Sequence, residues 1–150
     1  MPQSLSRVII HLVYSTKHRE PLITPNIDAE MHRYHAGTLT GLGCLPIRVG
    51  GADDHIHLLF ALGRTITIAK TVEKLKTGSS VLIKERNPRF DAFHWQGGYG
   101  AFSVAETDIA RVAAYIDRQR EHHQTISFQE EYLALLKEYG IAYDERYVWD

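Results

Sequence analysis

Two histidines separated by one residue are the feature of this sequence most able to do chemistry. His55 and His57 flank Ile56 within residues 53–60, a run rich in residues that favour β-strands. Side chains alternate between the two faces of a strand, so both imidazoles would lie on one face while Ile56 points to the core. They would be about 7 Å apart, close enough for a divalent metal ion to draw them together. The alternative is a pair of solvated polar residues on a half-exposed strand.

A polar stripe on a later helix offers a further ligand. The stripe follows helical spacing and consists of Arg111, Tyr115, Gln119 and His122. Tyr115 lies one turn before Gln119, so a phenol oxygen and an amide oxygen reach the same patch of surface and could supply a nucleophile and a metal ligand. The alternative for Tyr115 is a boundary residue whose ring packs and whose hydroxyl reaches water. Gln119 alone could be plain surface.

The apolar patterns predict four strands and four helices that would position these residues. Strands are expected over 7–16, 44–50, 55–60 and, with a glycine-rich loop inside it, 93–104. The first helix is expected to start at Thr24–Pro25 and run to about Leu42, and the second to start at a cap, Thr65 or Thr67, and run to about Leu82. The third is expected to start at a capping box over 103–106 and include the polar stripe, and the fourth to span 128–139.

The resulting order, β-α-β-β-α-β followed by helices, predicts a ferredoxin-like α+β fold. Two helices would cover one face of an antiparallel sheet and leave the other face free. The first and third strands are central neighbours in that topology, so His55 and His57 would lie mid-sheet on the free face. The additional C-terminal helices would cover or border them. We expect residues 1–150 to form a single domain.

Composition favours an ordinary globular protein. Charged residues make up 23% and apolar residues 44% of the 150 residues, and the net charge is −1. Residues 64–89 hold seven basic and two acidic side chains, which suits phosphate binding or merely a solvated helix face. Cys44 is the only cysteine, so an internal disulfide is excluded. We find no secretory signal and no apolar run long enough to span a bilayer, and expect a cytoplasmic protein.

Several ordered blocks of the chain match one family. The blocks are Ser15–Arg19, His55–Phe60, Lys74–Lys76 with Gly78–Ser80, Phe93–Ser103, Tyr115–Gln119 with His122 and His123, and an ending with Ser127, Phe128, Glu130 or Glu131, Leu135, Leu136, Tyr143 and Asp144. Together they resemble the single-strand DNA transposases of the HUH endonuclease superfamily, the tyrosine transposases of compact bacterial insertion sequences.

The resemblance implies a role for each part of the site. His55, His57 and Gln119 would hold a divalent metal ion, Mg²⁺ or Mn²⁺, that polarises the scissile phosphodiester. Tyr115 would attack the phosphorus and keep the 5′ phosphate as a covalent phosphotyrosine. A free phenol has a pKa of about 10, so Tyr115 needs activation. The sequence identifies no general base for it.

The resemblance also implies partners. The substrate would be single-stranded DNA with a hairpin, and the protein would be a homodimer in which the tyrosine helix of one subunit can complete the site of the other. Gly97, Gly98 and Gly100 would be hinge points for that exchange, or alternatively a simple strand bulge. The candidate DNA-binding residues are Lys17, Arg19, Lys70, Lys74 and Lys76.

Two other functions are compatible with the sequence. The first is a domesticated relative that nicks and rejoins genomic palindromes without mobilising an element. The second is a non-catalytic module that binds single-stranded nucleic acid on the same platform, in which case removal of the Tyr115 hydroxyl would change nothing.

Overall fold

A four-stranded antiparallel sheet forms the centre of the computed structural model, which describes residues 2–86 and 88–150. The strands are β1 (Ile9–Ser15), β2 (Leu45–Ala52), β3 (His55–Ala61) and β4 (Gly100–Val104). Their order across the sheet is β2-β3-β1-β4, so the first and third strands are central neighbours, as predicted. β2 and β3 form the expected antiparallel hairpin.

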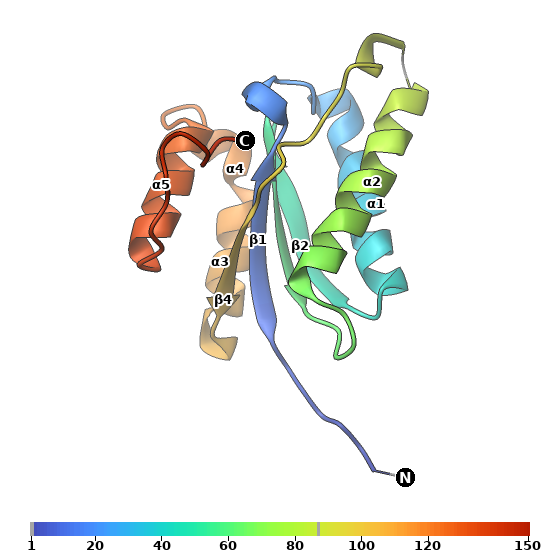
Figure 1. Cartoon of the computed structure of the whole chain (residues 1–150), viewed down its shortest axis with the longest axis vertical. Helices are drawn as coiled ribbons and strands as arrows, with labels where there is room; N and C mark the ends of the chain where they lie inside the picture. Colours follow the sequence, from blue (N-terminus) through green and yellow to red (C-terminus); the bar gives the residue numbers. More distant parts are fainter. Residues whose placement is uncertain (1, 87) are drawn as a thin grey trace.

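Helices cover both faces of this sheet (Figure 1). α1 (Pro25–Gly41) and α2 (Ile68–Arg86) lie on one face. The other face carries α3 (Ile109–Asp117), α4 (Gln119–His122) and α5 (Phe128–Glu138). The predicted ferredoxin-like α+β arrangement is confirmed, and the C-terminal helices occupy the face that this topology leaves free.

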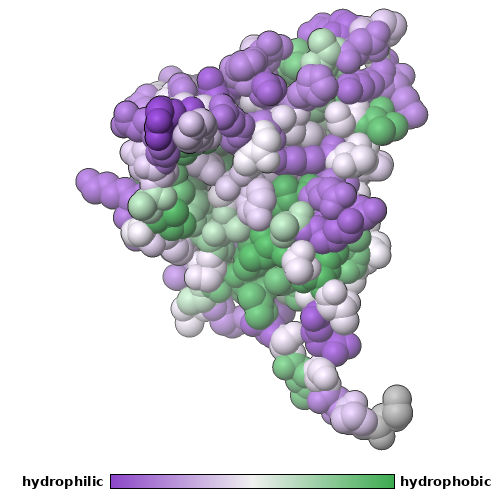
Figure 2. All heavy atoms as spheres, in the orientation of Figure 1, coloured by the Kyte–Doolittle hydropathy of each residue, from purple (hydrophilic) through white to green (hydrophobic). Residues whose placement is uncertain are grey.

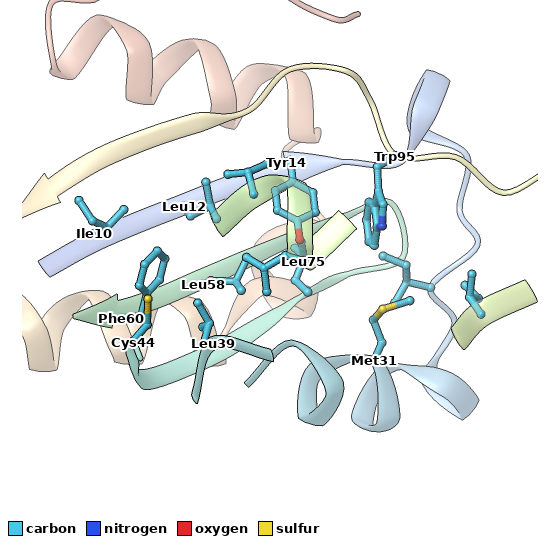
Figure 3. Close-up of a cluster of buried hydrophobic side chains, with 14 of the residues drawn as sticks. Ile10, Leu12, Tyr14, Met31, Leu39, Cys44, Leu58, Phe60, Leu75 and Trp95 are labelled. Atoms are coloured by element: carbon cyan, nitrogen blue, oxygen red, sulfur yellow. The ribbon is translucent and has the colours of Figure 1, made fainter. Parts of the chain in front are cut away.

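The largest apolar cluster lies between the sheet and the pair α1 and α2. Figure 3 shows Leu12 and Tyr14 of β1 and Leu58 of β3 facing Leu39 of α1 and Leu75 of α2. Smaller clusters fill the opposite side, where α3 and α5 pack on the sheet. All seven residues of β1 are buried, which explains why its sequence is nearly continuous in apolar residues.

The predicted strand over 93–104 with a loop inside it is found in part: Trp95 forms an isolated antiparallel bridge with Thr16, and β4 itself begins at Gly100. Lys76 of α2 holds the loop between them. Its Nζ atom donates hydrogen bonds to the backbone carbonyls of Gln96 and Gly98, each at 2.7 Å, and lies 3.4 Å from that of Gly97. These carbonyls point to a side chain, so they are not available to a neighbouring strand.

The third helix also differs from the prediction. Ser103 lies inside β4, opposite Ile10, so the predicted capping box at 103–106 is wrong. α3 starts at Ile109 after one turn of 3₁₀ helix, and a break at Arg118 (φ −99°, ψ 17°) separates it from α4. α5 begins as predicted, with a capping box formed by Ser127 and Glu130.

The outer surface is mostly hydrophilic at the end where η1 (Lys17–Arg19) lies, and hydrophobic residues gather in the lower middle of the space-filling view (Figure 2). Among the described residues, no helix combines the length and apolar character needed to cross a bilayer.

Candidate active site

Strand β3 places the two histidines on the face covered by α3, α4 and α5. His55 and His57 are both fully buried. β2 pairs closely with β3 at this point: a Cβ atom at Gly51 of β2 would lie 2.3 Å from the carbonyl oxygen of His55. Only glycine allows the two strands to approach this closely beside His55.

Helices α3 and α4 bring the other two predicted residues to the same place. Oε1 of Gln119 lies 2.8 Å from Nε2 of His55, and the ring of Tyr115 meets the ring of His57 edge-on, with centroids 5.8 Å apart. α3 packs directly on β2, because a Cβ at Gly50 would lie 2.8 Å from Cγ2 of Ile116. One chain therefore brings together all four predicted residues.

A fifth residue, Glu131 of α5, lies at the centre of the group and is only 3% exposed. Its Oε1 atom is 3.0 Å from Nε2 of His57 and 3.4 Å from Nε2 of His55. Its Oε2 atom accepts a hydrogen bond from the amide of Gln119 at 2.9 Å and another from the hydroxyl of Tyr115. From the sequence, Glu131 was noted only as part of the ending that resembles the family, and no role in the site was predicted for it. The missed signal is an acid three residues after Phe128, on the buried face of a helix.

The second nitrogen of each strand histidine also has a partner. Nδ1 of His55 lies 2.7 Å from a carboxylate oxygen of Asp54. Nδ1 of His57 lies 2.8 Å from Nε2 of His11, a buried β1 residue that was not predicted to belong to the site. Such contacts fix the orientation of an imidazole and are typical of histidines that bind metal ions.

The donor set fits a divalent cation. Nδ1 of His55 donates to Asp54, so a neutral ring presents the lone pair of Nε2 to Oε1 of Gln119. Two acceptors 2.8 Å apart repel unless a proton or a cation lies between them. Ligands about 2.1 Å from one ion would be about 3.0–3.4 Å from each other. His55, His57, Gln119 and Glu131 are spaced in this way, and the first two with Glu131 form a group able to hold a metal ion.

The charges in the site would also be stabilised by a cation. Burial lowers the pKa of His57, and burial together with His57 lowers the pKa of His11 to about 3. Although burial opposes it, the contacts with His123 and His57 hold the pKa of the Glu131 carboxyl far below its usual range. Burial, and then the charge of Glu131, raise the pKa of the Tyr115 phenol above its usual value. The site thus holds an ionised carboxylate and a phenol that stays protonated without a nearby cation.

A cavity of about 220 Å³ between α3 and α5 leads to this group. Tyr115, Glu131 and His122 line it together with His11. His55, His57 and Gln119 are buried behind them. A ligand would therefore meet the phenol and the carboxylate before the strand histidines.

The candidate DNA-binding residues fall into two groups. Lys70, Lys74 and Lys76 belong to α2, on the face of the sheet opposite the site. Lys17 and Arg19 lie in η1, directly after β1 and at the end of the sheet where β3 begins. The guanidinium of Arg19 is 5.5 Å from the ring centroid of Trp149. A role in DNA binding stays a prediction for all five.

Comparison with known proteins gives consistent matches. A family model described as Transposase IS200 like matches residues 4–119. A protein of Deinococcus radiodurans R1 assigned as a candidate transposase shares the fold with a TM-score of 0.62 and 20% identity, over 80% of this chain and 96% of that one. A REP-associated tyrosine transposase bound to a REP hairpin has a TM-score of 0.61 and 8% identity, over 84% of this chain and 74% of that one. Curated proteins gave no match.

The fold and the family model identify the chain as a transposase, a class of enzyme that cleaves DNA and transfers strands. The chain belongs to the IS200-like transposase family, because the family model spans most of its length. The resemblance noted from the sequence blocks is confirmed.

Proposed function

We propose that this transposase cleaves and rejoins single-stranded DNA at hairpin-bearing element ends through a covalent 5′-phosphotyrosine on Tyr115. One observation carries the proposal: the hydroxyl of Tyr115 and the amide of Gln119 meet the pair His55 and His57 around the carboxylate of Glu131. Family membership and a structural neighbour solved with a hairpin support the type of substrate.

The reaction exchanges one phosphodiester for another. The phenol oxygen of Tyr115 attacks phosphorus, the bond from phosphorus to the 3′ oxygen breaks, and a proton converts that oxygen to a 3′ hydroxyl. The 5′ phosphate stays on Tyr115. Attack by a different 3′ hydroxyl reverses these steps and frees the tyrosine. The number of phosphorus–oxygen bonds is conserved, so the rejoining needs no ATP.

The surrounding residues position the nucleophile and a metal ion. Oε2 of Glu131 accepts the hydrogen bond of the phenol, so this atom orients the nucleophile. His55, His57, Gln119 and Glu131 would hold the cation, and the imidazoles suit Mn²⁺, whereas Mg²⁺ is expected from the family. The bound ion would neutralise charge that builds up on the phosphate oxygens.

The proposed site does not require a residue from a second subunit. Gln119 and Tyr115 reach the histidines of their own chain, and the segment with Gly97 and Gly98 is held by Lys76. The homodimer with shared sites stays a prediction of the resemblance.

The direct test uses a labelled single-stranded hairpin oligonucleotide with the element's end and Mn²⁺. The wild type should give a protein–DNA adduct that survives denaturation, and Tyr115→Phe should give none. Tyr147→Phe is the matched control, since Tyr147 is 61% exposed and does not line the cavity that leads to the site. If Tyr115→Phe and the wild type bind the hairpin equally and neither cleaves it, the protein is a binding module.

A further inference from the structure

A buried histidine of the central strand β1, His11, is not among the proposed metal ligands. It lies on the face of the sheet that carries α3 and α5, because it shares that face with Ile9 and Val13. β1 pairs with β3 so that Val13 is opposite His57 and His11 is opposite Leu59. A side chain on one strand also reaches the residue diagonally opposite on its neighbour, which here brings His11 to His57.

The contact between these two rings has the geometry of a hydrogen bond. Nε2 of His11 lies 2.8 Å from Nδ1 of His57, the ring centroids are 5.0 Å apart, and the ring planes differ by 26°. This centroid separation is close to the largest that such a short contact between nitrogens permits, so the rings lie end to end and not face to face. One nitrogen therefore donates a proton and the other accepts it.

Binding of a cation would fix the direction of this bond. An imidazole binds a metal ion through the lone pair of one nitrogen, and the nitrogen of His57 that faces Glu131 is Nε2. The proton of the neutral ring must then lie on Nδ1. Within residues 2–86 and 88–150, His11 is the only group at hydrogen-bond distance from this Nδ1 atom, so Nε2 of His11 has to accept the proton.

Without a cation, the opposite direction is favoured. Nε2 of His57 is 3.0 Å from Oε1 of Glu131 and can donate to that carboxylate, which leaves a lone pair on Nδ1 for a proton from His11. A neutral imidazole carries its proton on either of its two nitrogens, so the ring of His11 satisfies His57 in both states. A side chain that offered no acceptor would support only the state that does not bind metal.

We propose that His11 is a positioning residue that selects the tautomer of His57 able to bind the metal ion. This inference rests on the proposed function, because it requires His57 to be a ligand. If no acceptor were beside it, the proton on Nδ1 of His57 would be buried and unpaired, which is unfavourable. The ring would then keep its proton on Nε2 and present no lone pair to the ion.

The first test is the affinity of the full-length protein for Mn²⁺ in a calorimetric titration. Cleavage is a poorer measure, because His11 also meets the ring of Tyr115 edge-on, with centroids 6.3 Å apart. We expect His11→Leu to weaken Mn²⁺ binding by about 10- to 100-fold, the usual effect of removing the partner of a metal-binding histidine. His11→Gln should restore most of the affinity, since its amide presents either an oxygen or an N–H group. Ile9→Ala is the control, because it removes packing from the same face of β1 at a distance from His57.

The second test reads the tautomers in the wild type by nitrogen-15 NMR of its histidine side chains, so it holds even if His11→Leu does not fold. In the protein loaded with diamagnetic Mg²⁺, we expect both His57 and His11 to carry their proton on Nδ1. A proton on Nε2 of His11 in the loaded protein would overturn the inference. Wild-type affinity for Mn²⁺ in His11→Leu would overturn it too, as would equal losses in His11→Leu and in either His11→Gln or Ile9→Ala.

Failure of this inference is distinguishable from failure of the proposed function. If His57→Ala loses Mn²⁺ binding and His11→Leu keeps it, the proposed metal site stands and only the role of His11 is wrong. If the wild type binds no Mn²⁺, or if His57→Ala binds it as tightly as the wild type, the proposed metal site and this inference are both contradicted.

Discussion

At the scale of single residues, the site depends on one carboxylate with many partners. Glu131 contacts two strand histidines, the glutamine of α4 and the phenol of Tyr115. Burying an ionised carboxylate is costly unless charge or hydrogen bonds compensate it. The convergence of these groups on Glu131 explains how an ionised acid can lie on the buried face of α5, and it makes this residue the most informative one to change.

Glu131→Gln keeps the shape of the side chain and removes its charge. We expect the affinity for Mn²⁺ to fall at least tenfold, because a neutral amide is a much weaker ligand than a carboxylate. Even mutation of residues that only hydrogen-bond to metal ligands lowers metal affinity by this much. Calorimetric titration measures the change. The control is Glu130→Gln, on the exposed side of the same helix, where glutamine can still complete the capping box. Equal affinity in Glu131→Gln and the wild type would remove Glu131 from the ligand set.

The buried histidine of α1 should make the stability of the protein depend on pH. Burial lowers the pKa of His35 to about 4, and the ring bonds the hydroxyl of Tyr14 at 2.7 Å and the carbonyl of Met31 at 2.8 Å. The unfolded chain, with a histidine pKa of about 6.5, takes up the proton first as pH falls. Stability from His35 is therefore present above pH 6.5 and is lost between about pH 6.5 and 4, at up to about 1.4 kcal/mol per pH unit.

Urea unfolding at a series of pH values measures this loss. Other buried histidines contribute to the same fall, so the comparison is between the wild type and His35→Gln. The variant should have a shallower decline between pH 6.5 and 4. If the two proteins lose stability in parallel between pH 6.5 and 4, burial does not keep His35 neutral in the folded protein.

At the scale of elements, the close contact between α3 and β2 sets the position of Tyr115. Gly50 lies against Ile116, the residue after Tyr115, and a Cβ would come within 2.8 Å of the side chain and 3.0 Å of the backbone oxygen of Ile116. Neither the sheet nor the helix can be moved at this point without moving the phenol. The glycine thus connects the hairpin that holds the histidines to the helix that holds the nucleophile.

Gly50→Ala should push α3 away from the sheet. We expect a loss of about 1–3 kcal/mol in the free energy of unfolding, the usual cost of overpacking, together with a slower rate of adduct formation. Gly37→Ala in α1 is the control: its Cβ would meet nothing within 4 Å, and it should stabilise the helix by about 0.5–1 kcal/mol. Normal stability and activity of Gly50→Ala would contradict the packing argument.

The elements of the sheet were predictable because their signals are local. Alternation placed His55 and His57 on one face, and Thr24 with Pro25 marked the start of α1. The break at Arg118 and the late start of β4 were not predictable, because they depend on contacts distant in the sequence, such as that between Lys76 and the carbonyls of Gln96 and Gly98. Glu131 was missed although the C-terminal helices were expected to cover or border the histidines, because the sequence does not show which side chain of 128–139 reaches them.

At the scale of the whole molecule, the arrangement places a complete set of proposed catalytic groups in one chain. α3, α4 and α5 all cover the sheet to which they are joined (Figure 1). A dimer could still form, but it would not be needed to bring Tyr115 to His57.

Mixing two inactive variants distinguishes these arrangements. Tyr115→Phe lacks the nucleophile and His57→Ala lacks a metal ligand, so a mixture regains activity only if one subunit supplies the tyrosine to the other's histidines. We expect no adduct above that of the separate variants. Recovery of adduct in the mixture would show that the helices exchange between subunits.

The proposed reaction bonds the phenol oxygen of Tyr115 to the 5′ phosphate of cleaved DNA. The most direct measurement is mass spectrometry of peptides from the wild-type protein after reaction with a hairpin oligonucleotide and Mn²⁺, followed by nuclease trimming of the DNA. We expect one modified peptide, with a 5′-linked nucleotide on Tyr115. A nucleotide found on another residue, or cleaved DNA with no nucleotide on any peptide, would contradict it.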